Sequence, residues 1–344
     1  MLRRGPVTLL YSQYVQEGEV LIMDRWRIAG FAAFAALAAV SCGASAQKYA
    51  SKPVRLVVPF APGGGTDTMA RLVAQKMSDV LGQSVVVDNR GGGGGTIGAE
   101  MAAHATPDGY TLILIASSYA SNAVLHKLTY DPIRDLHPII MLGETAFMIA
   151  AHPSVPAKTV KELIDLAKAK PGKLNYATPG VGSSPHFAFE LLKSMAGINI
   201  VHVPYKGSGL ALSDLLGGRQ TQMMITGLVA LVPHVKAGRL RAIGVTTAKR
   251  FPSLPDVPSI GETVPGYEAS GWYGVCGPRG IPQTVASLWN KEVNKMLGTE
   301  EMKKRLEADA LEPVGGAPDY LMNTIKRDIE KWKKVVKEAK ISVS

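Results

Sequence analysis

Glycines stand beside hydroxyl or ionisable side chains in three turns, each of which follows an apolar, strand-like run. The turns are Phe60–Asp67, Thr178–His186 and Val203–Gly209. Glycine lets the backbone approach a ligand closely, and the helix after each turn adds positive potential at its N-terminus. The pattern favours binding of an anion such as a carboxylate. The alternative is that the glycines only permit tight turns.

Hydroxyl groups at these strand ends are candidate ligand donors. Thr66 can cap the helix that follows it or donate to a ligand. In the second turn Ser184 is the expected helix cap, which leaves Thr178 and Ser183 free to meet a ligand. Ser117–Ser118 closes another strand-like run and offers two more hydroxyls. Neutral donors are therefore expected from several loops at once.

Two ionisable residues also occupy these turns. His186 falls in the first turn of a predicted helix, where the positive end of the helix dipole disfavours the charged imidazole. We therefore expect a neutral, hydrogen-bonding His186. Lys206 either attracts an anionic ligand or is simply solvated, and the sequence leaves both readings open.

Catalysis and cofactor binding find little support. Ser183 and His186 have no evident acidic partner, and the chain contains no G-x-S-x-G nucleophile turn. Gly93, Gly95 and Gly98 match the dinucleotide pattern, but Ser117–Ser118 stands where that pattern requires an acidic residue. The seven histidines show no H-x-H or H-E-x-x-H spacing. We expect a protein that is not an enzyme and that has no cofactor and no metal site.

The N-terminus carries an export signal. Met23–Arg27 is a short basic start, Ile28–Val40 is apolar, and Ala44–Ala46 supplies small residues for cleavage after Ala46. The apolar run is too short to span a bilayer comfortably. Residues 1–22 resemble neither a signal nor a domain, so we hypothesise that translation begins at Met23 rather than Met1. Lipidation of Cys42 is not expected. The mature protein should be periplasmic.

Composition and charge exclude other classes. The chain is 46% apolar and 19% charged, as in soluble globular proteins, and its formal net charge is +10. The basic residues of Lys326–Lys340 alternate with acidic ones, which is typical of a solvated helix face, so we expect no nucleic-acid partner. After cleavage only Cys276 remains, in an apolar stretch that predicts a buried thiol without a disulfide.

Strand-like and helical segments alternate along the chain. The predicted strands are Val54–Phe60, Val85–Val87, Tyr110–Ala116, Leu174–Ala177, Ile198–Val203, Met223–Ile225 and Leu240–Thr246, with an extended stretch at Ala269–Gly277. The predicted helices are Met69–Leu81, Thr159–Lys170, Ser184–Met195, Leu210–Leu216, Leu228–Lys236, Pro282–Leu297, Thr299–Ala308 and Pro318–Ala339. Nearly continuous apolar strands between helices predict parallel sheets covered on both faces. Two such α/β units, the second inserted in the first, account for the pattern.

An ordered set of motifs resembles a known family over roughly residues 48–343. It comprises Pro59–Asp67, Asp88–Gly91, Pro107–Leu112, Pro171–Tyr176, the loop to His186, Val203–Gly207 and Leu254–Pro258. In these segments the chain is similar to the periplasmic solute receptors of the tripartite tricarboxylate transporter system, often called Bug proteins.

The resemblance implies a type II periplasmic-binding-protein fold of two α/β lobes, the Venus flytrap. Lobe 1 would comprise residues 47–147 and 246–344, and lobe 2 residues 148–245. It also implies that one ligand carboxylate is held by amides and hydroxyls of the Phe60–Asp67 and Thr178–His186 loops. Many members carry Phe-Asp-Asn where this chain has Ile225–Gly227, so an amino-acid ligand is less expected.

We therefore predict a monomeric receptor that closes on a small organic carboxylate and delivers it to the membrane subunits of a tripartite tricarboxylate-type transporter. A ligand sensor for a signalling system is the alternative, and an exported hydrolase a weaker one. The predicted ligand contacts are Phe60, Ala61, Gly63, Gly64, Thr66, Asp67, Ser117, Ser118, Thr178, Gly180, Gly182, Ser183, His186, Pro204, Tyr205, Lys206 and Thr226.

Overall fold

A computed structural model describes residues 49–339 except residues 219 and 309. Lys52–Ser344 forms one compact unit, and Met1–Ser51 a separate one of which only residues 49–51 are described. The predicted signal peptide, the upstream extension and Cys42 lie outside the described residues. None of the described helices is both long enough and apolar enough to cross a bilayer.

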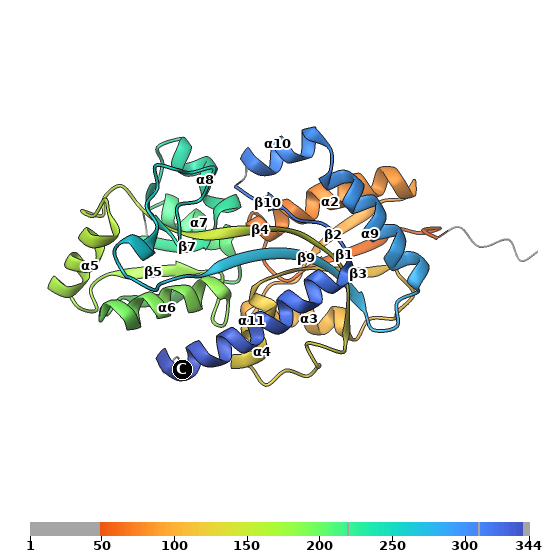
Figure 1. Ribbon diagram of the computed structural model, residues 1–344, viewed down its shortest axis with the longest axis horizontal. Coiled ribbons are helices and arrows are strands. Elements are labelled where there is room, and N and C mark those ends of the chain that lie inside the picture. Colours follow the sequence, from red (N-terminus) through yellow and green to blue (C-terminus); the bar gives the residue numbers. More distant parts are fainter. Residues whose placement is uncertain (1–48, 219, 309, 340–344) are drawn as a thin grey trace, which may run out of the picture. The chain divides into compact units, whose positions relative to one another are not determined.

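A mixed β-sheet forms the centre of the compact unit (Figure 1). Its strands are β1 (Val54–Val58), β2 (Val85–Asn89), β3 (Thr111–Ala116), β4 (Leu136–Ala151), β5 (Asn175–Thr178), β6 (Val201–Pro204), β7 (Met223–Gly227), β8 (Arg241–Val245), β9 (Ser270–Pro278) and β10 (Glu312–Pro313). They follow the order β2-β1-β3-β9-β4-β7-β5-β6, and β8 and β10 both pair with β4.

Helices cover this sheet. They are α2 (Gly65–Leu81), α3 (Thr96–Ala103), α4 (Ser118–Leu125), α5 (Val160–Ala169), α6 (Ser184–Ala196), α7 (Ser208–Leu216), α8 (Leu228–Lys236), α9 (Gln283–Leu297), α10 (Glu300–Ala308) and α11 (Pro318–Ala339), with short 3₁₀ turns η1 (Gly93–Gly95) and η2 (Ile260–Glu262). We call β1–β3, β9 and β10 with α2–α4 and α9–α11 the β1 half. We call β5–β8 with α5–α8 the β5 half.

Strand β4 belongs to both halves (Figure 1). It pairs with β9 as far as Ala146, opposite Ser270, and from Phe147 onward it pairs with β7, beginning opposite Gly227. Its pairings with β9, β7 and β8 are antiparallel, whereas β1 with β2 and β3, and β5 with β6 and β7, are parallel. This change of partner, between residues 146 and 147, lies one residue before the lobe boundary expected at 147/148. The division into lobes remains a prediction.

Local signals set the ends of the helices. Gly82 ends α2 in the left-handed conformation, directly after the predicted last residue Leu81. Thr159, the predicted first residue of the next helix, caps α5 by accepting from the Glu162 amide. The prediction that Ser184 caps the next helix was wrong, because Ser183 is the N-cap of α6 and accepts from the His186 amide. Pro185 occupies the first turn, where its missing N–H costs nothing.

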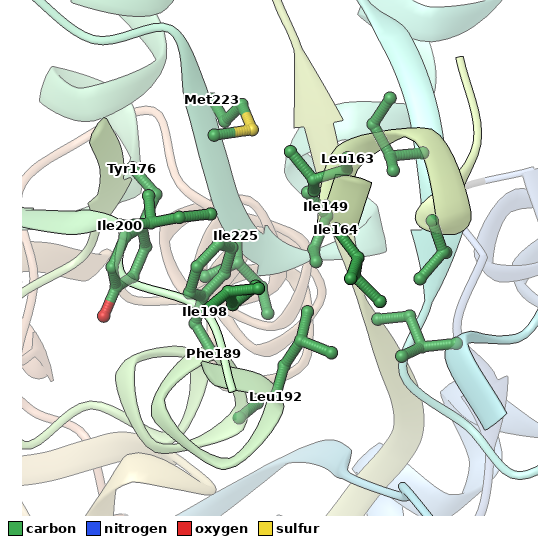
Figure 2. Packing of buried hydrophobic residues seen from close by; sticks show 14 of the residues in the cluster. Ile149, Leu163, Ile164, Tyr176, Phe189, Leu192, Ile198, Ile200, Met223 and Ile225 are labelled. Carbon is green, nitrogen blue, oxygen red and sulfur yellow. The ribbon is translucent and has the colours of Figure 1, made fainter. Parts of the chain in front are cut away.

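Apolar side chains pack on both faces of the sheet in the β5 half. Figure 2 shows one cluster, in which Ile149 and Ile225 of adjacent strands meet Ile164 of α5 and Phe189 of α6. Burying each such side chain contributes about 1.5–3 kcal/mol. In the β1 half the predicted buried thiol is confirmed, because Cys276 is 1% exposed. These cores hold the strand ends, and so the turns that follow them, in fixed positions.

Candidate functional site

A small cavity lies where turns of the two halves meet beside β4 and β9. Its walls are Phe60, Gly65, Thr66, Ala116, Ser117, Ser118, Thr145, Phe147, Pro179, Pro185, Ser208, Thr226, Gly227, Gly271, Trp272 and Tyr273. It leaves about 30 Å³ for the centres of water molecules, which is room for roughly two of them. Residues of both halves contribute to its walls.

The walls combine neutral hydroxyl donors with apolar surfaces. None of the described wall residues carries an acidic or a basic side chain. Thr66, Ser117, Ser118, Ser208 and Thr226 are all buried, yet each reaches the cavity. The Ser208 and Thr226 hydroxyls share one hydrogen bond of 2.6 Å, so one of the two keeps a hydrogen to donate. A ligand group that accepts hydrogen bonds fits such walls.

Four of the described helices begin at the cavity with no side-chain cap. These are α2, α4, α7 and α8, whose N-caps are Gly64, Ser117, Gly207 and Gly227. The first amides of a helix have no partner within the helix, and the dipole places about half a positive charge there. The convergence of four such ends favours an anion without any cationic side chain.

The 178–186 loop contributes differently from the prediction. The Thr178 hydroxyl contacts His202 Nε2 at 2.7 Å, and the Ser183 hydroxyl donates to the Gly180 carbonyl at 2.7 Å. From this loop only Pro179 and Pro185 line the cavity, and proline has no N–H to offer. The loop therefore forms an apolar wall. The Thr178 and Ser183 hydroxyls are used within the β5 half, whereas the Ser184 hydroxyl lies 3.3 Å from that of Ser121 in the β1 half.

Two stacked histidines lie under the same loop. The ring centroids of His186 and His202 are 4.2 Å apart. Burial lowers the pKa of His186 to about 4, and burial together with the neighbouring His186 lowers the pKa of His202 to about 3. This agrees with the predicted neutral His186, although burial rather than the helix dipole is the main cause.

Direct hydrogen bonds join the two halves around the cavity. The Ala61 amide donates to the Lys206 carbonyl at 2.9 Å. On the other side, the Ser184 amide donates to Ser118 Oγ at 3.1 Å, and Ser121 Oγ donates to the Gly182 carbonyl at 2.8 Å. These bonds would break if the halves separated.

The five-glycine run lies at this contact between the halves. The Val181 carbonyl occupies the place that a Cβ atom on Gly94 would need, and Gly94 itself lies where a Cβ on Gly180 would fall. Gly94 also has a positive φ of 63°, which favours glycine. The run therefore lets the backbones of η1 and the 178–186 loop touch.

The structure divides the predicted site residues. It places Phe60, Thr66, Ser117, Ser118 and Thr226 on the cavity wall. It places Ala61, Gly63, Gly64, Asp67, Thr178, Gly180, Gly182, Ser183, His186, Pro204, Tyr205 and Lys206 in the surrounding turns but not on the wall. Ligand contact by any of them stays a prediction.

Two further residues of the second group, Asp67 and Tyr205, have partners elsewhere in the structure, and Lys206 is exposed. Asp67 accepts hydrogen bonds from Arg71, the Gly63 amide and Asn89, which outweigh the opposing effect of burial and lower its pKa. The Tyr205 hydroxyl donates to Asp214 at 2.7 Å. The Lys206 side chain is exposed, which matches the solvated reading of this residue.

Sequence reasoning missed much of the wall. Thr145 and Phe147 come from the middle of β4, and Trp272 and Tyr273 from β9. Nothing in their local sequence marks them, because they lie inside apolar runs rather than in glycine-rich turns. Ser208 belongs to the glycine-containing turn Val203–Gly209 but was not among the predicted ligand contacts.

Comparison with known proteins assigns the family. The sequence model described as "Tripartite tricarboxylate transporter family receptor" matches residues 69–341. Protein BugT of Bordetella pertussis is 35% identical over 309 residues, which are 89% of this chain and 94% of BugT.

Solved structures agree with this assignment. Rpa4515 of R. palustris, solved with adipate, has a TM-score of 0.82 and 39% identity, covering 86% of this chain and 99% of its own. MatC of Rhodopseudomonas palustris, solved with malate, has a TM-score of 0.79 and 33% identity, covering 84% of this chain and 100% of its own. The fold is that of periplasmic solute-binding proteins, and the matched proteins are receptors rather than enzymes. The chain belongs to the receptor family of the tripartite tricarboxylate transporters.

Proposed function

We propose that this receptor captures a small organic carboxylate in the cavity between its halves and delivers it to the membrane subunits of a tripartite tricarboxylate-type transporter. The observation that carries the proposal is the meeting of four uncapped helix N-termini at a cavity lined by hydroxyls and free of charged side chains. Such a site stabilises negative charge through peptide dipoles.

The energetics are sufficient for useful affinity. A hydrogen bond to a charged group contributes about 1.5–3 kcal/mol. Three or four such bonds, less the cost of association and closure, give roughly the −8 kcal/mol of micromolar binding. Thr66, Ser117, Ser118 and Thr226 are the proposed side-chain donors, and Phe60 packs against the carbon chain of the ligand.

Capture proceeds by closure of two lobes, residues 47–147 with 246–344 and residues 148–245. The open form admits the ligand, and the ligand favours the closed form because it bonds to helix ends of both lobes. Export through the signal peptide, cleaved after Ala46, places the monomeric receptor in the periplasm. The relatives solved with adipate and malate support a carboxylate ligand.

Calorimetry on the mature protein tests the proposal, with C4–C6 carboxylic acids as probes. We expect micromolar binding of at least one acid, and Ser117→Ala should weaken it about tenfold. Ser117 is the suitable target because its hydroxyl has no partner within the described chain. Ser287→Ala, on the exposed side of α9, is the control and should leave affinity unchanged. Absence of heat with every acid, or equal affinity of both variants, contradicts the proposal.

A further inference from the structure

The Tyr273 hydroxyl is an unused hydrogen-bond donor in the cavity wall. Tyr273 lies on β9, is 5% exposed and lines the cavity, and its hydroxyl bonds to no other group in the described part of the chain. Two other buried tyrosines are paired, since Tyr119 donates to the Pro132 carbonyl and Tyr267 donates to the Ala188 carbonyl at 2.8 Å. The Tyr130 hydroxyl also has no partner in the described part of the chain, but Tyr130 does not line this cavity. Because most buried polar groups are bonded, an unpaired hydroxyl on the cavity wall is suited to a partner that enters the cavity.

Two glycines from different halves make room for this hydroxyl. A Cβ atom on Gly65 would lie 2.5 Å from the Tyr273 oxygen, and one on Gly227 would lie 2.8 Å from it. Gly65 is the first residue of α2 in the β1 half, and Gly227 is the N-cap of α8 in the β5 half. The Tyr273 hydroxyl therefore lies between the uncapped N-termini of α2 and α8. A ligand atom placed there would be close to this hydroxyl and to both helix ends.

The base of the same side chain lies near another group of donors. Tyr273 pairs with Ala116 across β3 and β9, and the Ser117 amide donates to the carbonyl of Trp272. Ser117 and Ser118 begin α4 at that place. The cavity thus has one set of donors at the α4 end and a second at the phenol tip, separated along the Tyr273 side chain.

The Tyr273 hydroxyl acts as a hydrogen-bond donor. Burial raises the pKa of Tyr273, so the hydroxyl keeps its proton through the neutral range. None of the wall residues that the structure describes has an acidic side chain that could accept from an ammonium group. An acceptor such as a second carboxylate suits this position, and an amine does not.

We propose that Tyr273 determines specificity by donating a hydrogen bond to the second carboxylate of a short dicarboxylate, whose first carboxylate lies at Ser117 and Ser118. The inference rests on the proposed function, since it assigns an orientation to the ligand of that same site. The Tyr273 hydrogen bond would favour dicarboxylates over monocarboxylates whose other end is a methyl group.

The test compares wild type and Tyr273→Phe by calorimetry with two matched pairs, adipate with hexanoate and succinate with butyrate. Wild type should bind the better dicarboxylate at least about tenfold more tightly than its partner, as expected for one added charged hydrogen bond. Tyr273→Phe should remove that preference and change the monocarboxylate affinity by less than about twofold. Tyr267→Phe, which removes a buried hydroxyl far from the cavity wall, should keep the preference.

A second variant approaches the same point sterically. Gly227→Ala keeps an ordinary backbone conformation, with φ −59° and ψ 146°, but its methyl group fills the space beside the Tyr273 hydroxyl. Gly227→Ala should also weaken dicarboxylate binding. The double variant with Tyr273→Phe should lose less binding free energy than the sum of the losses in the two single variants.

Each contrary result has a distinct meaning. Tyr273→Phe with an unchanged preference, or with equal losses for both acids of a pair, overturns the role of Tyr273. Wild type that binds monocarboxylates as tightly as dicarboxylates overturns this inference and leaves the proposed function standing. Wild type that binds none of the four acids, nor any other acid of the C4–C6 series, contradicts the proposed function and this inference with it.

Discussion

The amide of Ala61 donates a 2.9 Å hydrogen bond to the carbonyl oxygen of Lys206, so the two halves meet backbone to backbone. Both residues follow strands, β1 in one half and β6 in the other. Contact at this distance leaves no room for side chains between the turns. The size of the side chains next to this hydrogen bond should therefore decide whether the two halves can close.

Gly209→Ala is predicted to block closure without harming the fold. Its Cβ would overlap the Pro62 carbonyl oxygen across the gap, while its own backbone is an ordinary helical position in α7. We expect ligand affinity to fall at least about tenfold, with the unliganded melting temperature unchanged or raised, because alanine favours helix. Small-angle scattering with ligand should show the variant remaining open. Gly298→Ala, whose Cβ meets nothing closer than 3.5 Å, is the control, and wild-type affinity in Gly209→Ala would refute the prediction.

Ser183→Ala is predicted to lower stability. Ser183 caps α6 and also donates to the Gly180 carbonyl, so its removal should cost about 1 kcal/mol of the free energy of unfolding. Urea unfolding without ligand measures this cost. Ser194→Ala, at an exposed position on the same helix, should have little effect. Equal midpoints for both variants would contradict the capping role.

Acid is predicted to destabilise the folded receptor through His186 and His202. Their folded pKa values, about 4 and about 3, lie below the ordinary histidine pKa of 6.5, so below pH 6.5 the unfolded chain binds protons that the folded chain does not. The free energy of unfolding should therefore fall as pH drops from 6.5 toward 4, by at most about 1.4 kcal/mol per pH unit for each histidine.

Urea unfolding between pH 7 and pH 4.5 measures this loss, and histidine NMR should find both rings still neutral at pH 5. Replacing exposed His104 by Ala should leave the slope unchanged. A stability that is constant from pH 7 to 5, or a ring that titrates near 6.5, would show that the pair is not buried as described.

An amine on the ligand is predicted to weaken binding. The cavity wall offers no acidic side chain to an ammonium group, so aspartate should bind at least about tenfold more weakly than succinate. Thr226→Asp places a carboxylate on that wall and should narrow or reverse the preference. Calorimetry with the two ligands measures it. If the wild-type protein binds aspartate more tightly than succinate, the prediction that the cavity disfavours an ammonium group is wrong.

The sequence predicted the regular elements better than the cavity. The predicted end of α2 at Leu81 and the predicted start of α5 at Thr159 both agree with the structure, because the signals for helix ends act within one turn of helix. The choice between Ser183 and Ser184 as cap failed, since either residue can cap, and a contact from Ser118 in the other half uses the Ser184 amide.

Long-range pairing was beyond such signals. The 16 residues of β4 form one continuous strand that changes partner after Ala146, and no local pattern marks that change. Thr145, Phe147 and Tyr273 reach the cavity because the paired strands β4 and β9 run beside it. The glycine turns were located correctly, but which of them contribute donors depended on contacts between distant segments.

The uncapped helix ends have a consequence for the range of conditions in which the receptor works. Peptide dipoles do not titrate, so no group on the cavity wall gains or loses charge as the medium acidifies through the mildly acidic range. The solute's own carboxyl, with a pKa near about 4, then sets the acid limit of capture. Specificity can diverge among relatives by exchange of neutral wall residues, while the attraction for negative charge, which resides in the main chain, persists.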